Sequence, residues 1–206
     1  MKRARTAQAK EERRQLLLQA ALDEFYEKGF AAARTDDIAE RAGLSKGTLY
    51  LYFKSKDELF TALIKNLTSP KLDQIEMMAT QMPSLEMALS AFAEFAPKMI
   101  RESQMPRLMK VLIGESQAFP DIIAAYREQT LNRVLGAFAT MLESARERGE
   151  IEIENPELTA RLVIAPVVLS GVWQAVFSAT DPEPVDLETL FKTHIRFLLK
   201  ALKPGD

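Results

Sequence analysis

The stretch Thr35–Phe53, TDDIAERAGLSKGTLYLYF, decides how the rest of the chain is arranged. Thr35 is the predicted N-cap of a short helix, and two aspartates follow it where the helix dipole favours negative charge. Gly43 is suited to end that helix, because glycine adopts positive φ without a steric cost. Ser45 is the predicted N-cap of a second helix. The pattern therefore predicts two short helices joined by a tight turn.

The second helix of this pair presents two different faces. Leu49 and Phe53 lie four residues apart on its apolar face. Its remaining side chains supply a cation, a hydroxyl and two phenols, while one glycine permits close approach of the backbone. This arrangement is typical of a helix-turn-helix, whose second helix enters the DNA major groove, although an ordinary surface helix is the alternative interpretation. The predicted DNA-binding residues are Arg34, Thr35, Lys46, Gly47, Thr48, Tyr50, Tyr52 and Lys56.

The residues that follow this pair of helices favour DNA binding. Ser55 and Glu58 have the spacing of a capping box for another helix. Lys56 would then lie at the N-terminus of that helix, beside the recognition helix. Because backbone N–H groups and a lysine at one helix start can bind an anion together, the sequence predicts a phosphate contact there.

The run G-L-S-K-G-T-L-Y-x-Y-F-x-S-K-x-E-L at Gly43–Leu59 resembles the signature of the TetR family of transcriptional regulators. The resemblance covers residues 11–66, and beyond them it rests on length and helical pattern. The stretch Ile113–Pro120 is similar to AefR-like members of that family. The resemblance implies an all-α fold, with an N-terminal three-helix helix-turn-helix DNA-binding domain and a C-terminal helical domain for ligand binding and dimerisation.

Three segments are predicted along the chain. Residues 1–10 carry four cations and are expected to form a disordered basic arm, which either contacts phosphates or the minor groove or is simply solvated. Residues 11–67 form the DNA-binding domain, and residues 68–206 form the effector-binding and dimerisation domain. The boundary is placed at Thr68-Ser69-Pro70, which is expected to break the chain. Further helices are predicted over residues 11–28, 56–67, 71–81, 85–103, 106–116, 122–148, 156–179 and 186–202.

The composition of the 206 residues limits the chemistry of the protein. It has no cysteine and one histidine, His194, which excludes thiolate and multi-histidine metal centres. No cofactor is therefore expected.

Residues 1–65 hold 13 Lys and Arg against 10 Asp and Glu, so the basic end coincides with the helix-turn-helix. The N-terminus lacks the apolar region of a signal peptide, and a cytoplasmic location is predicted. The uncharged run 162–180 is interpreted as a buried helix rather than a membrane span.

The C-terminal part contains no set of residues with catalytic spacing, so the protein is not expected to be an enzyme. Residues 85–145 are rich in Met and Phe, which indicates either helix core or the deformable apolar pocket that the family resemblance implies. The predicted ligand-binding residues are Phe92, Phe95, Met99, Arg107, Met109, Gln117, Tyr126 and Trp173.

The last two predicted helices are apolar on more than one face. Such helices bury their second face in an interface between two copies of the chain, and the resemblance implies a homodimer built in this way. The predicted dimerisation residues are Val168, Val172, Phe191, Ile195 and Leu198.

The function predicted from these features is that of a homodimeric, sequence-specific transcriptional regulator. It is expected to act as a repressor that a small apolar or amphipathic molecule releases from double-stranded DNA with a palindromic operator. The alternative is a DNA-binding scaffold whose C-terminal domain binds another protein instead of a small molecule.

Overall fold

The computed structural model describes residues 2–204, and side chains from residue 7 onward. Its described residues form helices and connecting turns without any strand, which confirms the predicted all-α class. The chain forms two compact units. The first comprises the residues through Asn66 together with Lys110–Tyr126, and the second comprises Leu67–Met109 and the residues from Arg127 onward.

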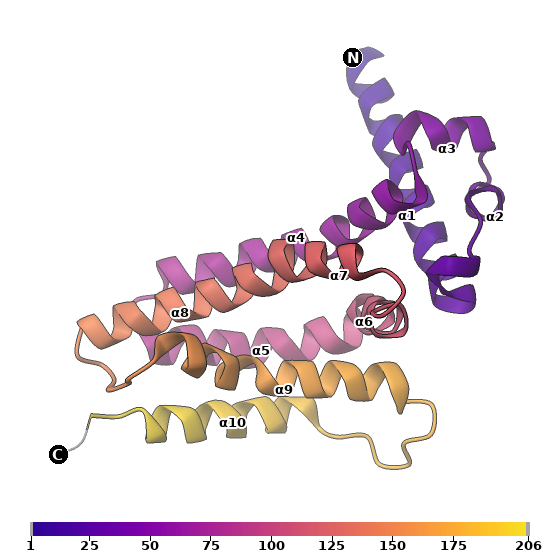
Figure 1. Cartoon of the computed structure of the whole chain (residues 1–206). Helices are drawn as coiled ribbons and strands as arrows, with labels where there is room; N and C mark the ends of the chain where they lie inside the picture. The colour runs from indigo at the N-terminus through magenta and orange to yellow at the C-terminus, as the bar shows by residue number, and fades with distance from the viewer. Residues whose placement is uncertain (1, 205–206) are drawn as a thin grey trace. The chain divides into compact units, whose positions relative to one another are not determined.

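The first unit contains three helices that precede the domain boundary predicted from sequence. These are α1 (Lys2–Ala32), α2 (Thr35–Arg41) and α3 (Lys46–Tyr52), which follow one another in Figure 1. Helix α1 extends back to Lys2, so the structure has helix where the sequence predicted a disordered arm. The helix leaves regular geometry only at Gly29, where φ is 78° and ψ is 160°. The helix predicted over residues 11–28 therefore continues past a kink at Gly29 to Ala32.

A cluster of aromatic rings fills the centre of the first unit. Phe25, Phe30 and Phe60 are each about 1% exposed, and their ring centroids are 5.1–5.2 Å apart. Phe60 belongs to α4 (Lys56–Gln81), which starts in this unit. Phe119, on the segment between α6 (Met105–Gly114) and α7 (Pro120–Tyr126), packs its ring edge-on against Phe30 at 4.7 Å. Aromatic burial of this kind holds α1, α4 and the later segment in one core.

Helix α4 corrects the sequence prediction, because it continues through Pro70 without the break expected at residues 68–70. Pro70 is exposed, whereas Leu72 and Ile75 on the following turns are buried. Proline removes one backbone hydrogen bond, but burial of the apolar face beyond it offsets that cost. Helix α5 (Leu85–Glu102) also contains a proline, Pro97, and continues through it as the predicted helix over residues 85–103 does.

The second unit is a bundle of long helices, in which α8 (Asn132–Glu147) packs on α9 (Pro156–Val176) and α5 packs on α10 (Leu187–Ala201). Figure 1 shows these four helices running alongside one another. Asn155 caps α9 by accepting a hydrogen bond from the Leu158 backbone N–H at 2.9 Å, as predicted.

The long helix predicted over residues 122–148 is divided in the structure. A π-helical segment, Arg127–Leu131, lies between α7 and α8. Its Thr130 is buried, and the Thr130 hydroxyl donates to the Thr68 hydroxyl at 3.4 Å. A π-helical turn rotates the following residues relative to a regular helix, and this change of phase cannot be recognised from hydrophobic spacing alone.

Candidate nucleic-acid interface

The turn between α2 and α3 has the geometry that the sequence predicted. Gly43 has a φ of 67°, and the Leu44 backbone N–H donates to the Ala39 carbonyl at 2.9 Å. Ser45 caps α3 by accepting a hydrogen bond from the Thr48 backbone N–H at 3.1 Å. Leu49, on the inner side of α3, is fully buried. The two helices therefore form a helix-turn-helix with a fixed turn.

A network of charges holds α2 against α1. The Glu24 carboxylate is only 3% exposed and accepts a hydrogen bond from Nε of Arg41 at 2.9 Å. Lys28 forms ion pairs with Glu24 at 2.7 Å and with Asp37 at 2.9 Å. The Lys28 hydrogen bond lowers the pKa of the Asp37 carboxyl below its ordinary value. A buried carboxylate needs such partners, so these ion pairs fix the position of α2.

The outward face of α3 carries polar side chains that have partners within the same unit. Lys46 pairs with Asp36 at 2.7 Å, and this hydrogen-bonded pair raises the pKa of Lys46 above its ordinary value. The Tyr50 hydroxyl lies 3.2 Å from the Thr35 hydroxyl. These contacts hold the two side chains on the exposed side of α3, where a phosphate or a base edge could exchange with their present partners.

Thr35 has a different place from the one predicted. It is the first residue of α2 rather than its N-cap, because Arg34 occupies the cap position and makes no side-chain cap hydrogen bond. Arg34 is exposed beside the helix start. Among the other predicted contacts, Gly47 is exposed, whereas Thr48 and Tyr52 are half-buried.

Lys56 has a structural role that the sequence did not indicate. Its Nζ donates to the backbone carbonyls of Phe30, Ala31 and Ala33, at 2.6, 3.1 and 3.1 Å. All three donors of the ammonium group therefore satisfy carbonyls at the end of α1. A phosphate could reach Lys56 only by displacing one of these bonds, and the phosphate contact stays a prediction. The capping box beside it is present in part, since Ser55 accepts from the Glu58 N–H at 3.1 Å.

Leu51 is the feature of α3 that sequence reasoning missed. Its side chain is 82% exposed, the highest value among the large hydrophobic residues that the structure describes as exposed. It occupies the variable position of the L-Y-x-Y-F motif, so the motif itself gave no reason to examine it. Its apolar side chain on an otherwise polar face was the available signal.

Comparison with known proteins identifies the family of this chain. Residues 17–63 match the family described as bacterial regulatory proteins, tetR family, and residues 87–202 match the AefR-like transcriptional repressor C-terminal domain. The chain belongs to the TetR family of transcriptional regulators. This result confirms the resemblance drawn from Gly43–Leu59. It also confirms that the protein is a DNA-binding regulator and not an enzyme.

Three relatives show how far this similarity extends. The HTH-type transcriptional activator FasR of Mycolicibacterium smegmatis is 39% identical over 192 residues, which cover 91% of this chain and 82% of FasR. A TetR-family regulator from Mesorhizobium loti has a similar fold, with a TM-score of 0.77 at 22% identity over 95% of this chain and 98% of that one. The flavonoid-responsive regulator FrrA has a TM-score of 0.63 at 28% identity, over 95% of this chain and 100% of FrrA.

The predicted ligand-binding residues of this TetR-family regulator belong to both units and differ in burial. Phe92 is buried, with its ring 4.8 Å from that of Phe138, so it belongs to the core of the second unit. Trp173 is 45% exposed, and its indole Nε1 donates to Asp181 at 2.6 Å. Gln117 is exposed on the first unit. The role of Phe92, Trp173 and Gln117 as pocket residues stays a prediction.

The other predicted ligand-binding residues lie at intermediate depth. Phe95, Met99, Arg107 and Met109 are half-buried in the second unit, and Tyr126 is half-buried in the first. Burial raises the pKa of the Tyr126 phenol to about 12, so the hydroxyl stays protonated and can donate a hydrogen bond at neutral pH. These five remain predicted contacts.

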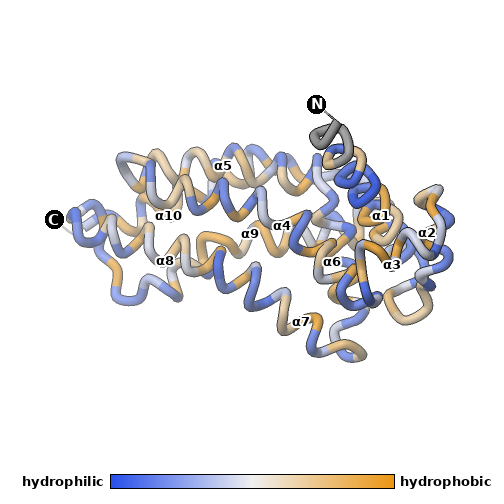
Figure 2. Tube along the Cα trace, turned by 90° about the horizontal axis from the view of Figure 1, so that it is seen from above, coloured by the Kyte–Doolittle hydropathy of each residue, from blue (hydrophilic) through white to orange (hydrophobic). Residues whose placement is uncertain are grey.

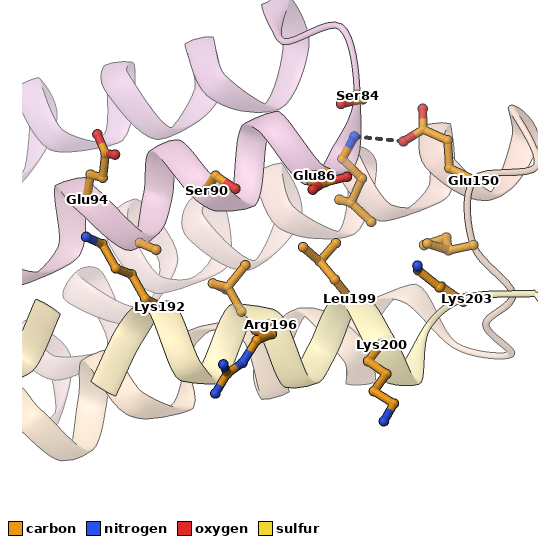
Figure 3. A pocket seen from close by; sticks show the side chains of 14 residues that line it. Ser84, Glu86, Ser90, Glu94, Glu150, Lys192, Arg196, Leu199, Lys200 and Lys203 are labelled. Carbon is orange, nitrogen blue, oxygen red and sulfur yellow. Dashed lines mark hydrogen bonds between the residues drawn. The ribbon is translucent and has the colours of Figure 1, made fainter. Parts of the chain in front are cut away.

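A groove of about 1000 Å³ lies between α5 and α10, and its close view is Figure 3. Leu85, Ile195 and Leu199 are among its apolar lining residues. Lys192 of α10 points toward Glu94 of α5 across the groove (Figure 3). None of the eight predicted ligand-binding residues lines this groove, so sequence reasoning did not identify it.

The predicted dimerisation residues are divided by the structure. Phe191 is fully buried and Ile195 is 3% exposed within one chain, so neither adds much exposed apolar surface, and their place in an interface stays a prediction. Sequence periodicity places these residues on an apolar face but does not show which partner covers it. Val168 is 46% exposed, while Val172 and Leu198 are half-buried, and these three remain predicted interface residues.

Helix α9 carries an exposed apolar stripe, formed by Leu158, Leu162, Leu169, Trp173 and Val176, each between 45% and 65% exposed. These residues recur at intervals of three, four and seven, and the colouring of Figure 2 shows hydrophobic positions along the helix. The helix is long and apolar enough to cross a membrane by length and composition. Only 22% of its most apolar window is buried, which corrects the buried helix predicted over residues 162–180. A large exposed apolar stripe is typical of a surface that another protein surface covers.

Proposed function

We propose that this TetR-family protein is a homodimeric transcriptional repressor in the cytoplasm, which binds a palindromic operator and is released by a small molecule. The observation that carries the DNA-binding part is the hydrogen-bonded turn between α2 and α3, after which Lys46, Gly47 and Tyr50 are exposed together on one helix. A helix N-terminal segment of this kind contacts base edges in the major groove.

The homodimer is supported by the exposed stripe on α9. Two copies that cover this stripe around a two-fold axis would present two recognition helices. Half-sites would then lie about one helical turn apart, roughly 10 base pairs or a multiple of it, so the operator should be an inverted repeat.

Response to a small molecule is supported by the AefR-like C-terminal match and by the similarity to FrrA, which is a flavonoid-responsive regulator. Repression is supported by the name of the matched domain, although FasR is an activator. The alternative of a scaffold that binds only a protein partner is not favoured by these relatives. An effector would act by binding the DNA-free state more tightly than the DNA-bound state.

The proposal is tested by selecting duplexes from random DNA with the purified full chain at physiological salt. Enrichment of an inverted repeat is the expected result, and Lys46→Ala should reduce retention of that repeat. Binding that changes with salt but enriches no sequence would contradict the proposal, because it would show only attraction to phosphates. The enriched duplex then serves as the probe for release by small molecules. Release at saturating compound, without unfolding of the protein, supports ligand response.

A further inference from the structure

The side chains on the exposed face of α3 differ in how firmly the protein holds them. Lys46 is paired with Asp36, and the Tyr50 hydroxyl is hydrogen-bonded with Thr35. Leu51 is 82% exposed on the same helix. Part of the hydrogen-bonding capacity of Lys46 and Tyr50 is therefore already used within the protein, whereas the Leu51 side chain is covered only by solvent.

The position of Leu51 on α3 places it beside the groups expected to approach DNA. Gly47 lies four residues before it, which is one turn of helix, and therefore on the same face. Gly47 carries no side chain that would keep the helix backbone away from the groove floor. Leu49 lies on the opposite side and is fully buried, so the helix cannot rotate about its axis to hide Leu51 without exposing Leu49.

Single exposed leucines occur on many protein surfaces, so exposure by itself does not indicate a binding role. Two further observations distinguish Leu51. It is far more exposed than Tyr50, which is 44% exposed on the same short helix. It also lies on the recognition helix of a DNA-binding unit, where an aliphatic side chain can recognise only an apolar group. In the major groove the apolar group on a base edge is the C5-methyl of thymine.

We infer that Leu51 is a specificity-determining residue, whose side chain contacts the C5-methyl group of one thymine in each half-site. This inference rests on the proposed function, because it requires α3 to lie in the major groove of an operator. It adds an apolar contact with one base to the contacts proposed for the polar residues of α3. The contact is apolar, so it should contribute to sequence preference while leaving the salt dependence of binding unchanged.

The test uses the full chain and the operator obtained by selection. Each thymine is replaced in turn by deoxyuridine in both half-sites, which removes only the C5-methyl group. At one position the wild-type protein should bind more weakly, by roughly fourfold for each methyl group lost, the size expected for one buried carbon. Leu51→Ala should bind the thymine and uridine operators equally, because the contact is already absent. The losses from the variant and from uridine should therefore not add.

The matched control is Leu16→Ala, since Leu16 is an exposed leucine on α1 in the same unit, at 52%. It should keep the wild-type sensitivity to uridine. Alanine is a better helix former than leucine, so Leu51→Ala should retain α3, which thermal unfolding verifies. A selection repeated with Leu51→Ala should lose the preference for thymine at that position and keep the rest of the inverted repeat.

The possible failures are distinguishable. If the wild-type protein enriches no sequence, the proposed function fails and the inference fails with it. If it enriches an inverted repeat but tolerates uridine at every thymine, only the role of Leu51 is overturned. Equal uridine sensitivity of the wild type and Leu51→Ala overturns it as well, because another residue would then contact the methyl group.

Discussion

The Glu115 carboxylate accepts a hydrogen bond from the Phe30 backbone N–H at 2.8 Å, although 85 residues separate them in sequence. This N–H follows Gly29 directly, at the kink of α1 where φ is 78° and ψ is 160°. A Cβ atom added at residue 29 would lie 2.8 Å from the same Glu115 oxygen. Together with the ring contact between Phe119 and Phe30, the hydrogen bond ties the segment after α6 to the end of α1 within the first unit.

The kink makes Gly29→Ala a destabilising substitution. Alanine is disfavoured at this φ and ψ, and its methyl group would push the Glu115 carboxylate away from Phe30. We expect a loss of more than about 1 kcal/mol in the free energy of unfolding, measured by urea denaturation. Gly136→Ala is the matched control, because Gly136 is exposed in α8 and an added Cβ meets nothing within 4 Å. That variant should be more stable by about 0.5–1 kcal/mol. Equal effects at the two glycines would contradict this explanation.

The contacts of Lys56 and Lys46 predict different consequences for the same substitution. Lys56→Ala leaves three carbonyls at the end of α1 without their donor, so it should lower the melting temperature. Lys46→Ala removes only an exposed ion pair with Asp36, which contributes little to stability. It should instead weaken DNA binding and reduce the slope of log affinity against log salt by about one. Thermal unfolding and binding titrations at several salt concentrations measure both effects. A salt slope reduced by Lys56→Ala at unchanged stability would support the phosphate contact predicted from sequence.

Local sequence signals predicted the local geometry well. Gly43, Ser45 and Asn155 act as predicted, because a positive φ or a cap depends on a few neighbouring residues. The signature at Gly43–Leu59 also led to the correct family, which residues 17–63 confirm.

Sequence reasoning did not show the contacts that form where distant parts of the chain meet. Lys56 has its partners 23 to 26 residues earlier, and no local pattern shows that its ammonium group reaches those carbonyls. Phe191 and Ile195 have the same apolar periodicity whether their own chain or a second copy covers them. Pro70 predicted a break because its effect on the backbone is local, whereas the packing that maintains α4 is tertiary. Leu51 was missed for a different reason, since a motif draws attention to its fixed positions.

Lys71 predicts how the stability of the second unit depends on pH. Its Nζ donates to the Leu67 carbonyl at 2.9 Å, and partial burial lowers the pKa of the ammonium group from its ordinary 10.5. The unfolded chain therefore holds this proton more tightly than the folded chain does. Keeping Lys71 charged in the folded chain lowers the free energy of unfolding at neutral pH. That cost decreases as the pH rises through the folded pKa and toward 10.5. Lys71→Met should raise the melting temperature at pH 7, and the gain should shrink at alkaline pH.

The control for Lys71→Met is Lys65→Met, because Lys65 is exposed on the same helix. Removing an exposed charge should change the melting temperature little at either pH. A gain from Lys71→Met that is the same at pH 7 and near pH 10.5 would show that added apolar burial, rather than removal of the charge, stabilises the variant.

The exposed stripe of α9 predicts that a single charge abolishes the homodimer. Leu169 is 65% exposed near the middle of the stripe, and in a two-fold interface each copy would bury its own Leu169 side chain. Leu169→Glu should therefore yield the mass of one chain in light scattering, where the wild type yields two, because two unpaired carboxylates would be desolvated. The change is at the protein surface, so helicity should be retained.

Met77→Glu is the control for Leu169→Glu, since Met77 is 46% exposed on α4 outside the stripe. The Met77→Glu variant should remain dimeric. The monomeric Leu169→Glu variant should lose affinity for the inverted repeat. It should bind a single half-site as weakly as the wild type does. A dimeric Leu169→Glu would show that another surface joins the two copies.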